Sequence, residues 1–278
     1  MQRTEKPEGE LMPDLLVEKK DHVGIVTLNR PERMNAISGQ MLAAFSESLI
    51  AFERDDDVRV IVITGAGRGF CAGLDLQDQA AGKGFDGESS GGGVGQGATT
   101  IDLRDAPPTV LHGLDKPTIC ALNGGAAGYG MDLALGCDIR IAADTAKMSA
   151  AFTKRGVIPE SGGTWLLPRI VGWSLASEIM FTGRKLSAEQ CLEYGIVNAV
   201  VPAHELMDAA MKLAREIAAN APLAVQATKR MMRMAQVESF EANIHHVFMQ
   251  LIPLFRTKDF AEGVASFLEK RDPNFQGK

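Results

Sequence analysis

Three continuous runs of apolar and β-branched residues constrain the fold of this chain most strongly. They are VRVIVITG at residues 58–65, PTICALN at 117–123 and DIRIAAD at 138–144. Strands that are covered on both faces have this signature, whereas half-exposed strands alternate polar and apolar residues. Helical sequence separates the three runs, so we predict an α/β fold with short strands.

Weaker signals predict the elements on either side of these runs. Two strands are expected in LLVEKK and HVGIVTLNR, around a turn at Lys20–His22. Ser38 is a candidate N-cap for the helix that follows. From Gly156 onward the pattern is mainly helical, with one helix opened by Pro222 and a last one that ends at Asp272–Pro273.

We divide the chain into a flexible tail at residues 1–13, a core at 14–202 and a helical C-terminal region at 203–278. Within the core, residues 80–100 are dominated by glycine and predict a mobile surface loop. The tail is polar and rich in glutamate, unlike a signal or transit peptide, and no apolar run has the length of a membrane span. These features favour a cytoplasmic protein with no membrane partner.

Composition excludes several classes of function. The net charge is −6, so the basic face of a nucleic-acid-binding protein is not expected. The four cysteines are widely spaced and favour a reduced, intracellular protein over a disulfide framework. The five histidines form no HExxH motif and no cluster with cysteine, so no metal site is predicted.

The glycine-rich segment contains two patterns that are known from other enzymes. Residues 82–87 match GxGxxG, the dinucleotide-binding motif, and residues 87–91 match GxSxG, the nucleophile motif of serine hydrolases. Both motifs require a strand before them and a helix after them. Neither element is expected here, so a dinucleotide enzyme and a serine hydrolase are disfavoured.

Two other glycine-containing stretches follow directly on predicted strands. In RGFCAGLDL, Gly73 allows a sharp turn that could leave the N–H groups of Leu74 and Asp75 free, although a plain strand-to-helix turn would look the same. In NGGAAGYGMDLALGCD, small residues around Gly128 precede a short helix, whose first N–H groups have no partner within the helix. Two such sites could converge on one carbonyl oxygen and form an oxyanion hole.

Four motifs together resemble the enoyl-CoA hydratase/isomerase family, also called the crotonase family. The motifs are LNRPERMNAIS, GRGFCAGLDL, NGGAAGYGMDLALGCDIRIA and IPESGGTWLLPR, and the resemblance extends from about residue 14 to the closing FAEGVASFLEKRDP. It implies a crotonase-like ββα spiral core with a helical C-terminal trimerisation region, assembled as a homotrimer or hexamer. It also implies an acyl-CoA thioester as the substrate, with coenzyme A as part of that substrate and no separate cofactor.

The resemblance assigns candidate binding residues. The backbone N–H groups that hold the thioester oxygen fall on Leu74 and on Tyr129, the residue after Gly128. Tyr129 replaces the usual glycine, and we expect its ring to shape the acyl pocket. The positions that line coenzyme A in the family are Arg33, Ala36, Ala72, Asp75 and Leu76, and Gly128 and Phe152 are also expected in the substrate-binding site.

The acid and base groups vary within the family. Hydratases hold a water molecule between two glutamates, whose positions are occupied here by Asp132 and by Phe152, which cannot move a proton. Glu160 matches the acid of enoyl-CoA isomerases, and dienoyl-CoA isomerases pair acids at the positions of Asp132 and Glu160. The resemblance therefore favours double-bond isomerisation. A hydratase that uses Asp132 and Glu160, and a non-catalytic acyl-CoA-binding protein, are the alternatives.

The surroundings of Glu160 in the sequence agree with a catalytic role. The residue stands in an apolar stretch interrupted by glycine, where only Arg155 or Arg169 could neutralise it. An apolar setting raises the pKa of a carboxyl group into the range that suits a proton shuttle. The structural alternative is an N-cap or first-turn acid for a helix that starts near Gly162.

Overall fold

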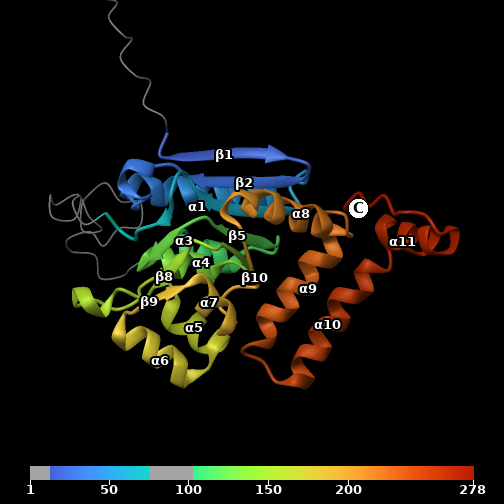
Figure 1. The fold of residues 1–278 in the computed structure, drawn as a ribbon. Coiled ribbons are helices and arrows are strands. Elements are labelled where there is room, and N and C mark those ends of the chain that lie inside the picture. The colour runs from blue at the N-terminus through green and yellow to red at the C-terminus, as the bar shows by residue number, and fades with distance from the viewer. Residues whose placement is uncertain (1–12, 76–102) are drawn as a thin grey trace, which may run out of the picture.

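The computed structural model describes residues 13–75 and 103–278, so the glycine-rich segment, Leu76 and nearly all of the N-terminal tail lie outside the described residues. The described part of the chain forms two sheets with helices packed around them (Figure 1). The larger sheet contains, in order across it, β1 (Leu15–Lys20), β2 (Val23–Leu28), β3 (Val60–Gly65), β5 (Thr118–Leu122), β7 (Ile139–Ala143) and β10 (Ala199–Val201). The strand predictions are confirmed.

The hairpin at the start of the larger sheet is its antiparallel part. Strands β1 and β2 pair with Lys20 opposite Val23, and all later neighbours in this sheet are parallel. The turn between them places Asp21 and His22 at φ values of 52° and 63°. Two successive residues with positive φ match the twist of a tight hairpin turn.

The smaller sheet runs beside the larger one. Its strands, in order, are β4 (Gly69–Cys71), β6 (Gly125–Ala127), β8 (Lys147–Ser149) and β9 (Lys185–Ser187). Each of β3, β5 and β7 is followed within a few residues by a strand of the smaller sheet, so the chain repeats a two-strand unit as it advances. This repetition places the ends of β4 and β6 next to each other.

Helices surround both sheets. They are α1 (Gly39–Arg54), α3 (Pro107–Gly113), α4 (Tyr129–Gly136), α5 (Gly163–Val171), α6 (Trp173–Thr182), α7 (Ala188–Glu193), α8 (Leu206–Ala218), α9 (Pro222–Ala235), α10 (Phe240–Leu254) and α11 (Lys258–Glu269), with short 3₁₀ turns at Pro31–Arg33, Thr153–Arg155 and Ala203–Glu205. Ser38 caps α1, as predicted, by accepting a hydrogen bond from the Met41 amide. The last helix ends at Glu269, three residues earlier than predicted, because Lys270 adopts a left-handed conformation.

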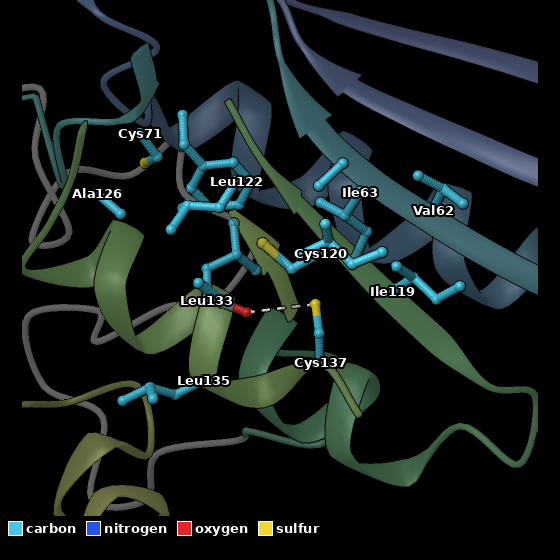
Figure 2. Close-up of a cluster of buried hydrophobic side chains, with 14 of the residues drawn as sticks. Val62, Ile63, Cys71, Ile119, Cys120, Leu122, Ala126, Leu133, Leu135 and Cys137 are labelled. Carbon is cyan, nitrogen blue, oxygen red and sulfur yellow. Dashed lines mark hydrogen bonds between the residues drawn. The ribbon is translucent and has the colours of Figure 1, made fainter. Parts of the chain in front are cut away.

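The buried core covers both faces of the larger sheet: α8 packs against β3, β5 and β7, and side chains of α4 meet the central strands. Figure 2 shows Ile63, Cys120 and Leu122 from the central strands close to Leu133 of α4, and all of these side chains are buried. The four cysteines are free and buried, in agreement with a reduced protein. These contacts hold helix α4 in place, and they therefore fix the position of its N-terminal end.

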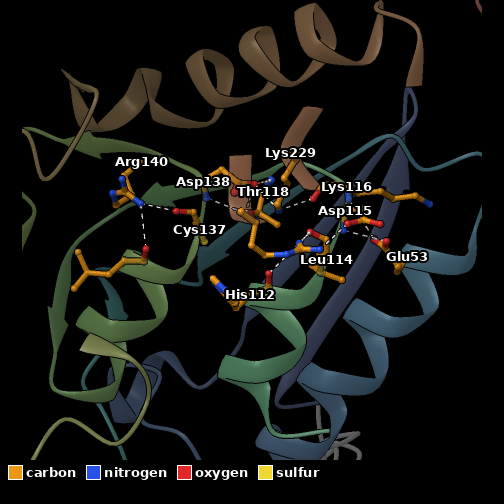
Figure 3. A network of polar contacts seen from close by, with 12 residues as sticks. Glu53, His112, Leu114, Asp115, Lys116, Thr118, Cys137, Asp138, Arg140 and Lys229 are labelled. Carbon is orange, nitrogen blue, oxygen red and sulfur yellow. Dashed lines mark hydrogen bonds and ion pairs between the residues drawn. The ribbon is translucent and has the colours of Figure 1, made fainter. Parts of the chain in front are cut away.

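A polar network joins the C-terminal helices to this core. Asp115 accepts hydrogen bonds from Arg230 and Arg233 of α9, and Lys229 contacts Asp138 at 2.7 Å. Asp138 also accepts hydrogen bonds from the amide and hydroxyl of Thr118 at the start of β5 (Figure 3). Among the helices of the described residues, none combines the length and the apolar composition that a bilayer span requires.

Candidate active site

The turn after β4 lies against the start of α4. Gly73 has φ +101°, and a Cβ at this position would lie 2.9 Å from the carbonyl oxygen of Ala127 and 3.7 Å from the amide nitrogen of Tyr129. The approach at Gly130 is closer still, since a Cβ there would lie 2.1 Å from the carbonyl oxygen of Cys71. Glycines at these positions allow two backbone segments from different strands to meet.

Where these segments meet, the backbone N–H groups of Leu74 and Tyr129 have no hydrogen-bond partner among the described residues. Ile37 and Leu74 form a parallel bridge, in which the Ile37 amide donates to Gly73 and the Asp75 amide donates to Ile37. The Leu74 amide takes no part in these bonds, and Tyr129 is the first residue of α4, where an amide has no partner within the helix. From the sequence, the amides of both Leu74 and Asp75 were candidate donors to a ligand. In the structure the Asp75 amide donates to Ile37, so Leu74 remains as the candidate.

The residues expected to line coenzyme A come together beside this turn, on two adjacent segments. Those that the structure describes are Arg33, Ala36, Ala72 and Asp75. The Ala72 amide donates to the carbonyl of Met34, and the buried Asp75 carboxylate lies 3.1 Å from Arg30 and 3.4 Å from Arg33. Arg30 also donates to the carbonyl of Ala36. This ion-pair cluster holds the two segments in register.

A cavity of about 710 Å³ opens between α1, α3, α4 and the segment that leads into α5. Its wall is mostly apolar. Of the predicted site residues that the structure describes, Tyr129, Asp132 and Glu160 line it. Phe152 is buried outside the lining, with its ring 3.9 Å from the place where a Cβ on Gly128 would lie. Phe152 therefore supports the turn before Tyr129.

Asp132 is only 1% exposed, although it lies at the cavity wall. Its Oδ2 accepts hydrogen bonds from the Ser161 hydroxyl at 3.0 Å and from the Gly163 amide at 3.1 Å. Its Oδ1 has no hydrogen-bond partner among the described residues. Burial outweighs the two hydrogen bonds, and the nearby Glu160 adds repulsion, so the pKa of Asp132 rises to about 7.

Glu160 reaches the same cavity from the loop that precedes α5. The N-cap of that helix is Gly162, which lacks a side-chain capping bond, so Glu160 does not act as the cap that its position in the sequence allowed. Both arginines that could neutralise it are engaged elsewhere: Arg155 donates to Ala151, and Arg169 lies over the Trp165 ring. Partial desolvation raises the pKa of Glu160 above its ordinary value.

Sequence reasoning missed several residues of this site. Ser161 and Gly163 both donate hydrogen bonds to Asp132. In the sequence they indicated only the start of a helix, and the run of small residues around them was the one feature that could have suggested a close contact. His112 and Trp165, which line the cavity with rings 5.2 Å apart, carried no recognisable pattern because α3 and α5 are far apart in the sequence.

Comparison with known proteins identifies the family. The sequence profile described as enoyl-CoA hydratase/isomerase matches residues 18–278. This chain belongs to the enoyl-CoA hydratase/isomerase family. It is similar to the 1,2-epoxyphenylacetyl-CoA isomerase of Escherichia coli, at 40% identity over 96% of this chain and 100% of the relative. It is also similar to the carnitinyl-CoA dehydratase of Salmonella arizonae, at 38% identity over 91% and 94% of the two chains.

Solved structures agree with this assignment. The enoyl-CoA hydratase EchA1 from Mycobacterium marinum has a TM-score of 0.86 at 32% identity, with 96% of this chain and 100% of the other covered. The predicted crotonase-like α/β fold with a helical C-terminal region is therefore confirmed. The protein is an enzyme of a family that acts on acyl-CoA thioesters, and its relatives include both isomerases and dehydratases.

Proposed function

We propose that the protein isomerises the double bond of an enoyl-CoA thioester, with Glu160 as the proton shuttle and Asp132 as a second acid. The observation that carries this proposal is the asymmetry of the carboxyl groups around the cavity. Asp132 and Glu160 both line it and both have raised pKa values. Phe152, at the position where the resemblance implies the second hydratase glutamate, is an apolar side chain buried outside the lining.

Isomerisation requires a proton to leave one carbon and return to another. Removal of a proton from the carbon next to the thioester produces an enolate, whose negative charge collects on the thioester oxygen. The amides of Leu74 and Tyr129 are proposed to hold that oxygen, since fixed backbone donors stabilise a developing oxyanion effectively. Glu160 then returns the proton two carbons further along the acyl chain, so that a single carboxyl group completes the shift.

Hydration is the second candidate reaction, because the family includes hydratases. It would require Asp132 and Glu160 to hold a water molecule between them. A panel of 2-enoyl-, 3-enoyl- and 3,5-dienoyl-CoA thioesters distinguishes the two reactions when water addition and double-bond position are followed together. A shift of the double bond without water addition is expected. Water addition to the 2-enoyl substrate as the dominant reaction would contradict the proposal.

Self-association is also proposed, as a homotrimer or a hexamer. Helices α10 and α11 expose many large apolar side chains, namely Phe240, Ile244, Phe248, Met249, Ile252, Phe260, Val264, Phe267 and Leu268. So many exposed large apolar side chains on two helices are unusual on a monomer and support a subunit interface. The proposal of three or six subunits is supported by the family resemblance alone.

A further inference from the structure

The contact between Ser161 and Asp132 has a role that the proposed reaction leaves unassigned. Ser161 is 5% exposed, and its hydroxyl points at Oδ2 of Asp132, the oxygen that also accepts from the Gly163 amide. Oδ2 therefore accepts two hydrogen bonds, whereas Oδ1 accepts none from the described residues. The two oxygens of the carboxyl group differ strongly in their hydrogen bonding. An oxygen that already accepts two hydrogen bonds is a poor place for a proton.

We propose that Ser161 is a positioning residue, whose hydroxyl keeps Oδ2 of Asp132 as an acceptor so that the exchangeable proton of Asp132 is carried by Oδ1. The inference rests on the proposed function, because it concerns the second acid of that reaction. Without the hydroxyl, Oδ2 would lose one of its donors, the backbone amides of Gly163 and Ser161 would remain beside the carboxyl group, and either oxygen could carry the proton. The ionised form would also lose a hydrogen bond that favours it.

Other ionisable groups near Asp132 do not offer the same control. The titratable or charged residues on α4 and on the elements packed against it are Tyr129, Cys71 on β4, His112 on α3, Arg169 on α5 and, on the preceding loop, Glu160. Burial raises the pKa values of Tyr129 and Cys71, so both stay neutral. Burial lowers the pKa of His112, which favours its neutral form. Glu160 is the group whose charge repels that of Asp132.

The test is an infrared pH titration of the Asp132 carboxyl group, isolated as the difference between each protein and the same protein carrying Asp132→Asn. Loss of one hydrogen bond to a charged group corresponds to a shift of about one to two pH units. We therefore expect the midpoint to rise by that amount in Ser161→Ala and the C=O stretch of the neutral acid to broaden. Ser161→Thr keeps the hydroxyl and should restore the midpoint.

The controls separate this inference from the proposed reaction. Ser266→Ala removes a buried hydroxyl that bonds to Gly263 in α11 and should leave the Asp132 midpoint unchanged. If Ser161→Ala does not fold, Ser161→Cys decides, with a smaller upward shift expected from its weaker donor. An unchanged midpoint in the folded variant overturns the inference. A shifted midpoint in a protein that lacks isomerase activity would retain the role of Ser161 and reject the proposed function.

Discussion

Gly163 lies so close to Asp132 that a Cβ on this glycine would be 2.1 Å from Oδ1 of the carboxylate. The same residue donates its amide to Oδ2, so the start of α5 both holds the carboxyl group and limits its space. A methyl group here would force Asp132 out of its position. The first prediction follows from this contact.

Gly163→Ala should reduce activity strongly and lower the free energy of unfolding by about 1–3 kcal/mol, the range typical of overpacked sites. Chemical denaturation and enzyme assays measure the two effects. Gly113→Ala is the matched control, since a Cβ at Gly113 would have no heavy atom within 4 Å. Equal behaviour of the two variants would show that the contact with Asp132 is unimportant.

Glu160→Gln should abolish most of the proposed isomerase activity, because it removes the proposed proton acceptor and nearly preserves the side-chain volume. The expected loss is about 10²–10⁴-fold in kcat. Affinity for acyl-CoA should change little, since the proposed backbone donors at Leu74 and Tyr129 remain. Stopped-flow assays of the folded variant give both quantities.

Asp132→Asn provides the comparison for that experiment. It should be milder for a 3-enoyl substrate and severe for a 3,5-dienoyl substrate, in which two acids share the proton transfers. Full isomerase activity in Glu160→Gln would place the base elsewhere.

The stability of the protein should fall as the pH rises from about 4 to about 7. The pKa of Asp132 is about 7 in the folded protein and is 3.8 for an ordinary aspartate, so in this window the folded state binds more protons than the unfolded state. Linkage then requires the free energy of unfolding to decrease with pH, by at most about 4 kcal/mol, and to level off above pH 7. Denaturant titrations across this range measure the slope. Asp132→Asn should make the free energy of unfolding nearly independent of pH in this range. An unchanged slope in this variant would mean that other groups cause the pH dependence.

Phe267→Glu should weaken self-association. Phe267 on α11 is 82% exposed within one chain, so a charge there should hardly affect an isolated subunit. In an interface the same charge would be desolvated, and the assembly should dissociate. Light scattering of the wild type and the variant measures this. Val17→Glu on β1 is the control at another exposed apolar residue. A wild-type protein that is monomeric at micromolar concentration would contradict the prediction.

The sequence predicted most reliably those features that depend only on neighbouring residues in the chain. The uninterrupted apolar run of β3 predicted a strand covered on both faces, and Ser38 predicted a cap, because neither depends on distant parts of the chain. The contacts that hold Asp132 were not predictable from local pattern, since Ser161 is 29 residues away and a serine before two glycines suits many loops. The hydrogen bond from the Asp75 amide to the Ile37 carbonyl was also not predictable, because it joins two segments without regular secondary structure.

The order of strands has a consequence for synthesis. Both sheets add their strands in the order in which the chain contains them, so each new strand can dock on one that has already left the ribosome. The walls of the cavity come from residues that precede Val171. A nascent chain can therefore bring the pocket residues together before α8, which packs against β3, β5 and β7 and completes the core, has been translated.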